Sequence, residues 1–401
     1  MTLQDKVLER LQGLDDAGLR RRLRVVDTPC GPQARVDGRE LLAFCSNDYL
    51  GLAAHPQVVQ ALQAGAALYG AGSGASHMIS GHSRAHALLE ARLSALYEPF
   101  IDQARALYFS TGYMANLALL TGLAQADDTV EFFSERLNHA SLIDGMRLSR
   151  APVQVYPHGD VAHLEQLLKE STASTRVIVT DSVFSMDGNL APLRELDALA
   201  QAYDACLVID DAHGFGVLGQ QGLGALEHLD LRSPRIVYMG TLGKAAGVSG
   251  AFVVAHAHIT EWLVQRARPY IYTTAASPAL AHALMTSLDI VTGDEGRQRR
   301  ETLATHVRRL RELLYLKHWS TPPTDTAIQP VIIGANTTAM QISSFLLTQG
   351  LWVPAIRPPT VPPDTARLRV TVSAAHDIDD VSRLARALNR AEREFHDYES
   401  Y

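Results

Sequence analysis

The sequence contains few cysteines and no long apolar segment. Its 401 residues include three cysteines, Cys30, Cys45 and Cys206, and no Cys-x-x-Cys pair. Three cysteines cannot form a disulfide framework, so we expect a reducing compartment and predict a cytoplasmic protein. No uninterrupted apolar run reaches about 18 residues. The charged start MTLQDKVLERLQ lacks the apolar stretch of a secretory signal, so we expect no membrane partner.

An excess of positive charge is also absent. The chain has 36 Lys and Arg against 43 Asp and Glu, which gives a formal net charge of −7. A protein that binds nucleic acid regardless of base sequence needs basic patches, so we expect no nucleic-acid partner. The composition, 47% hydrophobic and 20% charged, is typical of a globular protein with a large core. At this length an enzyme is the expected class.

Short apolar strands alternate with helical segments from about residue 51 to residue 290, the predicted large domain. This alternation predicts an α/β fold with a mainly parallel sheet, covered by helices on both faces. The expected strands are 106–109, 130–133, 153–156, 176–180, 206–209, 236–239 and 251–255, and the expected helices include 85–97, 113–124, 161–169 and 192–203.

The two ends of the chain predict a smaller α+β domain. The N-terminal segment, residues 1–50, begins with a helix expected over residues 2–24. A long helix over about residues 278–314 leads into the C-terminal domain, residues 291–401. We expect the N-terminal segment to close this smaller domain. Its expected strands are 328–333, 351–354 and 368–372, followed by a last helix at 379–398.

Three familiar motifs lack the context that their chemistry needs. Residues 70–75 fit the loose GxGxxG/A pattern, but a helix is expected before them where a dinucleotide site needs a strand. Residues 243–244 resemble the end of a phosphate loop without its first glycine or its Ser/Thr. His82 and His86 are four residues apart on an expected helix, but no third ligand is evident nearby. We therefore predict no metal site.

An acidic pair follows one of the apolar strands. Asp210 and Asp211 end the run CLVIDD, and His213 comes shortly after. Ligands of open α/β sheets bind at the carboxyl ends of strands, and a buried Asp needs a cationic partner such as a protonated ring nitrogen. By itself the motif fits a helix cap or half of a metal site equally well.

A lone lysine, a phosphate-binding turn and a histidine follow other strands. Lys244 lies among small residues in TLGKAAG, where a desolvated amine is nucleophilic, and Thr241 can offer a hydroxyl to an anion. Gly112 and Tyr113 open a helix whose free amides suit a phosphate. His139 fits either stacking on an aromatic cofactor or a structural role. In chain order these groups describe a site for pyridoxal 5'-phosphate (PLP).

Several longer blocks identify a family. The chain contains SNDYLG at 46–51, VFSMDG at 183–188, DDAHG at 210–214, TLGK at 241–244 and IRPPTVP at 356–362. In these blocks it resembles the α-oxoamine synthases, a branch of the fold-type I PLP-dependent enzymes, over nearly its whole length. The resemblance implies a large domain with a mostly parallel seven-stranded sheet, a smaller α+β C-terminal domain, PLP-dependent acyltransferase activity and a homodimer.

Within that branch, IRPPTVP and the N-terminal LRRR are most similar to the members that join L-alanine to a pimeloyl thioester in biotin biosynthesis. The expected partners are therefore L-alanine and either pimeloyl-CoA or a pimeloyl carrier protein. Three alternatives stay open. They are a sister synthase that joins glycine to acetyl-CoA or succinyl-CoA, a partner subunit without catalysis, and an aminotransferase. Retention of the lysine, the acid and both histidines argues against a subunit without catalysis.

The resemblance also implies roles for residues around the cofactor ring. By it, Lys244 binds the cofactor covalently, and Asp210 pairs with the ring nitrogen. His213 hydrogen-bonds the ring hydroxyl and His139 stacks on the ring, while Ser185 contacts the cofactor. These assignments make Lys244, Asp210, His139 and His213 the expected catalytic residues, and they add no metal to the site.

The same resemblance implies which residues hold the phosphate. The backbone at Gly112 and Tyr113 would bind it together with Thr241. Because family members place their sites at a dimer interface, Thr273 or Thr274 in YIYTT would reach the phosphate of the partner subunit. The phosphate site is thereby expected to draw on both chains of a homodimer.

Substrate contacts are implied at four further positions. Arg20 and Thr360 match substrate-binding residues, and Asn47 and Arg357 match positions near the amino-acid carboxylate. One segment, residues 75–79, departs from the family pattern because it lacks an arginine that many relatives have there. This segment lies near the acyl-CoA entrance in the family, so its effect on acyl choice stays open.

Overall fold

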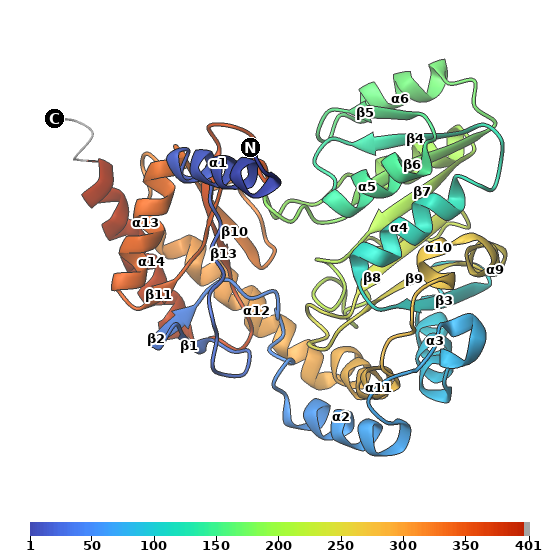
Figure 1. Ribbon diagram of the computed structural model, residues 1–401, viewed down its shortest axis with the longest axis horizontal. Helices are drawn as coiled ribbons and strands as arrows, with labels where there is room; N and C mark the ends of the chain where they lie inside the picture. The colour runs from blue at the N-terminus through green and yellow to red at the C-terminus, as the bar shows by residue number, and fades with distance from the viewer. Residues whose placement is uncertain (397–401) are drawn as a thin grey trace. The chain divides into compact units, whose positions relative to one another are not determined.

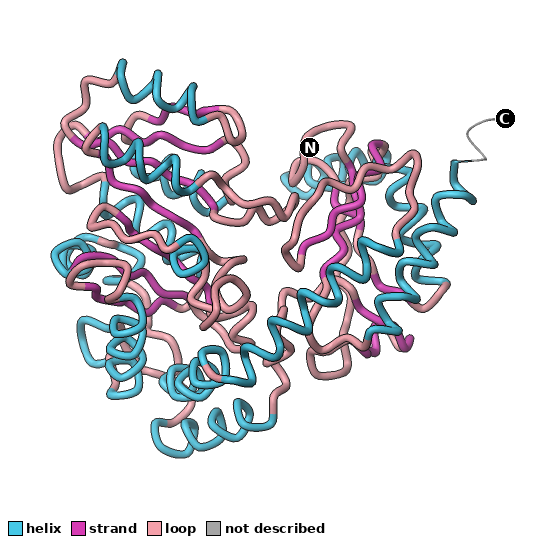
Figure 2. Tube along the Cα trace, turned by 180° about the vertical axis from the view of Figure 1, so that it is seen from behind, coloured by secondary structure: helices cyan, strands magenta, loops and turns pink. Residues whose placement is uncertain are grey.

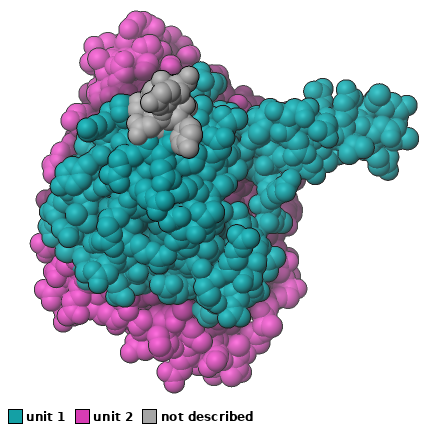
Figure 3. Space-filling model, turned by 90° about the vertical axis from the view of Figure 1, so that its left-hand side faces the viewer, with its two compact units in different colours: residues 1–49, 186–188, 302–401 teal, residues 50–185, 189–301 magenta. Residues whose placement is uncertain are grey.

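The computed structural model describes residues 1–396 and divides them into two compact units (Figure 1). Unit 1 contains residues 1–49, 186–188 and 302–401, and unit 2 contains residues 50–185 and 189–301. Figure 3 distinguishes the two units by colour. Residues 186–188 lie between two stretches of unit 2 along the chain but belong to unit 1. The sequence does not predict this assignment.

Unit 2 is built on a seven-stranded sheet with the order β3-β9-β8-β7-β6-β4-β5. Adjacent strands are parallel except at β9, which runs antiparallel to both β3 and β8. All the other strands of the sheet therefore point the same way. The strands are β3 (Ala104–Phe109), β4 (Val130–Glu135), β5 (Val153–Tyr156), β6 (Thr175–Asp181), β7 (Ala205–Asp210), β8 (Ile236–Thr241) and β9 (Ala251–His256).

Alternate side chains of each strand pack into two separate cores. In β7, Leu207 and Ile209 belong to one core cluster, whereas Val208 belongs to the other. Successive side chains of a strand point to opposite faces of its sheet, so a strand that is apolar throughout needs cover on both faces. Helices α3, α6, α7 and α11 supply one cover, and α4, α5, α9 and α10 supply the other. Figure 2 shows these helices around the strands.

The helices of unit 2 have the following bounds. They are α2 (Pro56–Tyr69), the π-helical turn η1 (His77–Gly81), α3 (Arg84–Tyr97), α4 (Gly112–Leu123), α5 (Ala140–Ser149), α6 (Val161–Glu170), α7 (Leu193–Ala202), α8 (Ala225–Leu229), α9 (Ala257–Arg266), α10 (Arg268–Ile271) and α11 (Pro278–Thr292). The helix α12 (Asp294–Leu313) begins in unit 2 and ends in unit 1. Within residues 1–396, no helix is both long and apolar enough to cross a membrane.

Unit 1 has two small sheets with helices. The antiparallel order β10-β13-β12 forms one, and β1-β2-β11 forms the other, with β11 parallel to β2. The N-terminal strands thus pair with a strand near the C-terminus. The elements are α1 (Leu3–Asp16), β1 (Gln33–Val36), β2 (Arg39–Ala43), β10 (Ile328–Gly334), α13 (Asn336–Thr348), β11 (Leu351–Trp352), β12 (Ala355–Ile356), β13 (Ala366–Thr371) and α14 (Ile378–His396).

The predicted α/β class and all seven predicted strands of the large sheet are confirmed, but two predicted helices are wrong in extent. The helix expected over residues 278–314 is divided at Gly293, whose extended backbone (φ −88°, ψ −174°) ends α11. The helix expected over residues 2–24 ends at Asp16, because Gly18 turns the chain with a φ of +62°. Residues 397–398 of the last predicted helix lie outside the described residues.

Close packing between α2 and α11 depends on one glycine. Gly65 is buried on α2, and a Cβ atom there would lie 2.9 Å from the Cβ of His282 and 3.0 Å from the Cα of Ala279. Because part of the obstacle is backbone, α11 would have to move to admit a side chain. A larger residue at position 65 therefore separates two helices of the large unit.

We expect Gly65→Leu to destabilise the protein by about 1–3 kcal/mol, the usual cost of overpacking. Gly13→Ala is the matched control, because a Cβ at Gly13 meets nothing within 4 Å and alanine favours the helix by up to about 1 kcal/mol. Denaturant unfolding followed by far-UV circular dichroism measures both variants. Equal stability of Gly65→Leu and the wild type would contradict the packing described.

Candidate active site

Six strands of unit 2 have their carboxyl ends at one edge of the large sheet, and a cavity of about 170 Å³ lies there. The parallel direction of β4, β6, β7 and β8 brings their carboxyl ends together, and β3 runs the same way. Seven residues predicted from the sequence line this cavity, namely Gly112, Tyr113, His139, Asp210, His213, Thr241 and Lys244. The sequence analysis missed other lining residues, among them Asn116, Ser141 and Asp181.

The carboxylate of Asp210, at the end of β7, is buried and held in place from two sides. Its Oδ2 accepts a hydrogen bond of 2.6 Å from Nδ2 of Asn116, and its Oδ1 accepts one of 2.9 Å from the amide of Ala212. The same Asn116 Nδ2 donates to Ser141 Oγ at 2.8 Å. A buried carboxylate is stable when it is hydrogen-bonded and meets a positive charge. These contacts leave Asp210 oriented for a cationic ligand.

Asp210 has an acidic neighbour on the adjacent strand. Asp181 ends β6 and stands opposite Asp210 in the register of the two strands. Burial raises the pKa of Asp181 well above its usual value, and the charge of Asp210 raises it further. Asp181 Oδ2 accepts the backbone amide of His139 at 2.7 Å, which is a bond that positions the histidine. Two carboxylates on adjacent strands do not both ionise readily, and burial favours the protonated form of Asp181.

His139 stands at the start of α5 in a neutral form. Its Nδ1 lies 2.7 Å from Ser141 Oγ and accepts the Ser141 amide at 3.3 Å, so the ring caps the helix. Burial lowers the pKa of His139, and the charge of Asp210 opposes that shift. The cap and the bond to Asp181 fix the ring at the wall of the cavity. A fixed neutral imidazole suits stacking on an aromatic ligand.

Lys244 and His213 face each other in the cavity. Nζ of Lys244 lies 2.8 Å from Nε2 of His213, so the ammonium donates to the imidazole. Lys244 stands in the turn after β8, where Gly247 has a φ of +70°. A Cβ at Gly247 would lie 2.5 Å from the backbone nitrogen of Ala53, so only glycine fits this turn. The turn thereby sets the place of the lysine.

The first turn of α4 presents amides to the cavity. Thr111 caps the helix by accepting the Met114 amide at 3.1 Å, and the helical ladder begins with the bond from Ala115 to Thr111. The amides of Gly112 and Tyr113 precede that ladder and belong to the N-terminal groups that a helix leaves for an anion. Thr241 is buried on the cavity wall and donates its hydroxyl to the Gly250 carbonyl at 3.1 Å.

The two acids of the DDAHG block have different tasks. Asp211 is fully buried and accepts hydrogen bonds from Ser182 Oγ, from Tyr238 OH at 2.7 Å and from the Ala225 amide at 2.7 Å. Burial raises the pKa of Asp211 to about 6, although these donors oppose the shift. Asp211 is therefore hydrogen-bonded to the residue that follows β6, to a residue of β8 and to the first residue of α8, whereas Asp210 faces the cavity.

Three of the predicted cofactor residues lie elsewhere in unit 2. Ser185 follows β6 and is not among the described residues that line the cavity. Thr273 and Thr274 also lie apart from it, and Thr274 pairs with Ser76 through a single antiparallel bridge. The side chain of Thr274 is exposed. These three residues stay predictions for contact with the cofactor.

The four predicted substrate residues all lie in unit 1. Arg20 forms an ion pair with Asp15, and Asn47 Oδ1 accepts a hydrogen bond of 3.2 Å from Arg369. Arg357 donates to the carbonyl of Gly18, which ties the IRPPTVP segment to the end of α1. Thr360 accepts a hydrogen bond of 3.3 Å from Arg21, the residue after Arg20 in the sequence.

Arg21 is a further cationic residue at this place that the sequence analysis did not single out. The pKa of Arg357 is lowered, mainly by burial and also by the charge of Arg21. Two arginine side chains near enough to act on each other's charge favour the binding of an anion. The basic cluster LRRR indicated that an arginine binds an anion here, but the sequence alone does not show whether that arginine is Arg20 or Arg21.

The cavity fits PLP by the chemistry of its walls. It offers a buried carboxylate for a ring nitrogen, a lysine amine for an aldehyde, a histidine for the ring face and helix amides for a phosphate. Within the described chain, Asn116 Oδ1 is buried without a hydrogen-bond partner, which is a further polar atom at this cavity. In the sequence, the only signal for these two residues is position. Asp181 is the last residue of β6, and Asn116 lies near the N-terminal end of α4.

Comparison with known proteins identifies the class. The family model of class I and II aminotransferases matches residues 39–388. A serine palmitoyltransferase from S. paucimobilis, solved with bound PLP and myriocin, has a TM-score of 0.89 and 27% identity over 99% of this chain and all of that chain. The chain therefore belongs to the class I and II aminotransferase family, with the fold-type I architecture, and its cofactor is PLP.

More similar sequences narrow the class. The 8-amino-7-oxononanoate synthases of Bordetella petrii and Janthinobacterium sp. are each 62% identical to this chain. The alignments cover 98% and 96% of this chain and 99% and 98% of those proteins. The solved 8-amino-7-oxononanoate synthase of Francisella tularensis has a TM-score of 0.76 and 27% identity over 90% of this chain and 99% of that chain. Within its class the chain belongs to the family of the 8-amino-7-oxononanoate synthases.

The raised pKa of Asp181 and the place of Asp210 on the cavity wall predict unequal effects of replacing these two acids. We expect Asp210→Asn to lower turnover more than 100-fold, which corresponds to about 3 kcal/mol. Asp181→Asn replaces a protonated acid by a group of the same shape that still accepts the His139 amide, so we expect a loss below tenfold. Steady-state kinetics and PLP titration of both variants provide the measurement. Equal losses would show that both acids are ionised.

Proposed function

We propose that this protein joins L-alanine to a pimeloyl thioester, with loss of CO₂ and of the thiol carrier, to give 8-amino-7-oxononanoate. The observation that carries the proposal is a single cavity with the Lys244 amine, the buried Asp210 carboxylate and the N-terminal amides of α4 on its walls. The high identity to named 8-amino-7-oxononanoate synthases supports the choice of substrates.

Asp210 and Lys244 have the central roles. PLP, when bound, takes up the electron pair that the amino acid releases at its Cα. Asp210 keeps the ring nitrogen protonated, because an ionised acid and a cation stabilise each other in a buried place. Lys244 holds the cofactor before the reaction, and its freed amine then moves the proton at Cα. His213, 2.8 Å from the Lys244 amine, orients that amine.

The remaining cavity residues hold and orient the cofactor. The amides of Gly112 and Tyr113 would bind the phosphate, since a helix N-terminus attracts an anion, and the Thr241 hydroxyl would join them by turning away from the Gly250 carbonyl. His139 stacks on the ring from its place at the start of α5. We assign Ser185 a contact with the cofactor on the family resemblance.

Arginines of unit 1 are assigned to the carboxylates of the two substrates. Arg20 and Thr360 bind the terminal carboxylate of the pimeloyl chain, and Arg357 with Asn47 binds that of alanine. A guanidinium matches both oxygens of a carboxylate. Acetyl-CoA has no such carboxylate, so these contacts favour the pimeloyl chain over an acetyl group. The hydrogen bond from Arg21 to Thr360 supports the placing of an anion at this segment.

We expect the wild type to have a higher kcat/KM for alanine with pimeloyl thioester than for glycine with acetyl-CoA or succinyl-CoA. Arg20→Ala should raise the KM for the pimeloyl substrate at least tenfold and leave the KM for alanine nearly unchanged, because one carboxylate contact contributes about 1.4 kcal/mol or more. Arg22→Ala, at an exposed arginine of the same cluster, is the matched control, and Arg21→Ala is measured beside it. A larger effect at Arg21 would move the contact to that residue, and a preference for glycine with acetyl-CoA would overturn the proposed reaction.

We further propose that the protein is a homodimer in which Thr273 or Thr274 binds the phosphate in the partner subunit. The exposed apolar surface of the chain supports a partner. None of the α1 side chains is buried against the rest of residues 1–396, and Leu8 on α1 is 68% exposed. Tyr272, next to the two threonines, is 71% exposed. Leu3 and Val7 of α1 are exposed as well, and exposed apolar side chains gathered on one helix mark an interaction site.

A mixing experiment tests the shared site. Lys244→Ala and the double variant Thr273→Val with Thr274→Val are each expected to be nearly inactive. When the two are refolded together, half of the dimers are mixed and each has one intact site, so about a quarter of the wild-type activity should return. Mass measurement by light scattering checks the dimer itself. Absence of recovery in confirmed mixed dimers would place the threonines in their own subunit's site, and full activity of the double variant by itself would place them outside any site.

A further inference from the structure

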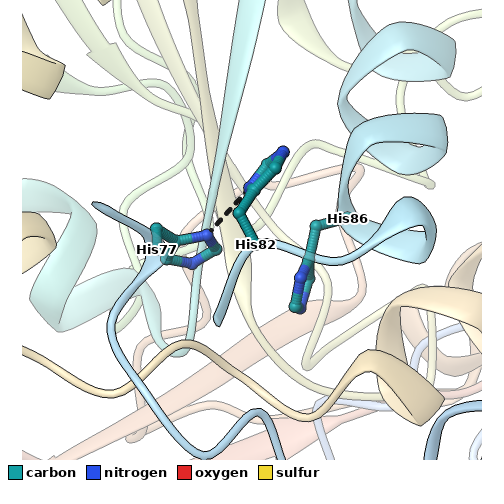
Figure 4. A group of neighbouring side chains, drawn as sticks. All are labelled: His77, His82 and His86. Carbon is teal, nitrogen blue, oxygen red and sulfur yellow. Dashed lines mark hydrogen bonds between the residues drawn. The ribbon is translucent and has the colours of Figure 1, made fainter. Parts of the chain in front are cut away.

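Three histidines of unit 2 gather outside the active-site cavity. His77 begins the π-helical turn η1, His82 follows that turn directly, and His86 lies in the first turn of α3 (Figure 4). Each imidazole offers one ligand nitrogen, and these nitrogens lie within 4.8 Å of one another. The sequence analysis considered only His82 and His86, because His77 lies outside the helical spacing that relates those two.

The arrangement of the rings is that of ligands around one metal ion. The ring centroids lie 5.3 Å apart for His77 and His82, 5.1 Å for His77 and His86, and 5.7 Å for His82 and His86. Imidazoles bound to one tetrahedral zinc ion at about 2.0–2.1 Å per bond have centroids about 5 Å apart. The Nδ1 atoms of His77 and His82 are 3.0 Å apart, close to the spacing of about 3.3 Å for two ligands of such an ion.

Two of the histidines have the outer partners that metal ligands need. Nε2 of His86 lies 2.9 Å from the carbonyl oxygen of Ala276, which is a hydrogen bond. Nε2 of His82 lies 3.7 Å from Oε2 of Glu90, which is beyond hydrogen-bond length but near enough for the carboxylate to face the ring. Metal-binding histidines usually donate their second ring nitrogen to a carboxylate or a backbone carbonyl, which fixes the ring. Nδ1 of His86 accepts the Ser83 amide at 3.0 Å, and a metal at this nitrogen would replace that bond.

A cavity of about 440 Å³ opens beside the cluster and gives a metal ion access to it. His77, His82 and Glu90 line this cavity, together with Arg105 and Glu261. A site with three protein ligands keeps a fourth position for water or another ligand, and this cavity has room for it. The cavity shares no residue with the one that contains Lys244.

We propose that His77, His82 and His86 bind a divalent transition-metal ion of the zinc class. Imidazole ligands suit zinc, cobalt, nickel and copper ions, whereas magnesium and calcium ions prefer oxygen. The ion would join η1 to α3. It would also fasten the segment that pairs with Thr274, since Ser76 bridges Thr274 and the Ala275 amide donates to the Ala75 carbonyl at 3.0 Å.

Cobalt binding to the untagged holoenzyme, first dialysed against a chelator, tests this site. A tetrahedral site gives visible Co²⁺ absorption, so we expect one such ion per chain and its displacement by Zn²⁺. His77→Gln and His82→Gln should each weaken Co²⁺ binding at least 100-fold. Glu90→Gln, which changes an outer partner, should weaken it 10- to 100-fold. His86 is left intact because it also caps α3.

His258→Gln is the control, because His258 is an exposed histidine whose ring lies 4.7 Å from that of His256 without belonging to the cluster. It should leave Co²⁺ binding unchanged. Two results would overturn the proposal: no Co²⁺ binding by the wild type above that of the His77→Gln, His82→Gln double variant, or an equal loss in His258→Gln. In either case the three histidines are a hydrogen-bonded cluster that stacks on Tyr270.

Discussion

The buried carboxylate of Asp210 is the constraint on which the rest of the site depends. Desolvation of an ionised carboxylate is costly, so the fold must supply hydrogen bonds and a cation to keep it there. Asn116 and the Ala212 amide supply the hydrogen bonds, and in the proposed function the ring nitrogen of PLP would supply the cation. Asp181 is next to Asp210 in register and becomes the protonated partner. The two acids come together because parallel strands have their carboxyl ends at the same edge of the sheet.

Local sequence signals predicted most of the fold. Each strand of the large sheet is a short apolar run between helical segments, and burial on both faces makes this pattern distinct. The errors lie where one residue ends an element. Gly293 divides a stretch whose composition is helical on both sides, and Gly18 ends α1 before the basic cluster. Glycine was a visible signal at both positions, but the continuing helical pattern outweighed it.

The site was predictable where a residue lies at the end of a strand, as Asp210 does, or in the turn just after one, as Lys244 does. Asn116 and Asp181 were missed because their importance arises from long-range contacts, such as the hydrogen bond from Asn116 to a carboxylate 94 residues away. His77 was missed for the same reason, because it comes near His82 and His86 only when the chain turns at η1. Helical spacing finds pairs on one face of a helix, and it does not find a third ligand from a turn.

The central claim is that Lys244 holds PLP in the cavity at the end of the large sheet, and one measurement tests it directly. The chain has four lysines, Lys6, Lys169, Lys244 and Lys317, so borohydride reduction of the holoenzyme followed by peptide mapping gives an unambiguous answer. The account predicts a reduced cofactor adduct on Lys244 alone. An adduct on another lysine, or no adduct in a protein that retains PLP, would contradict it.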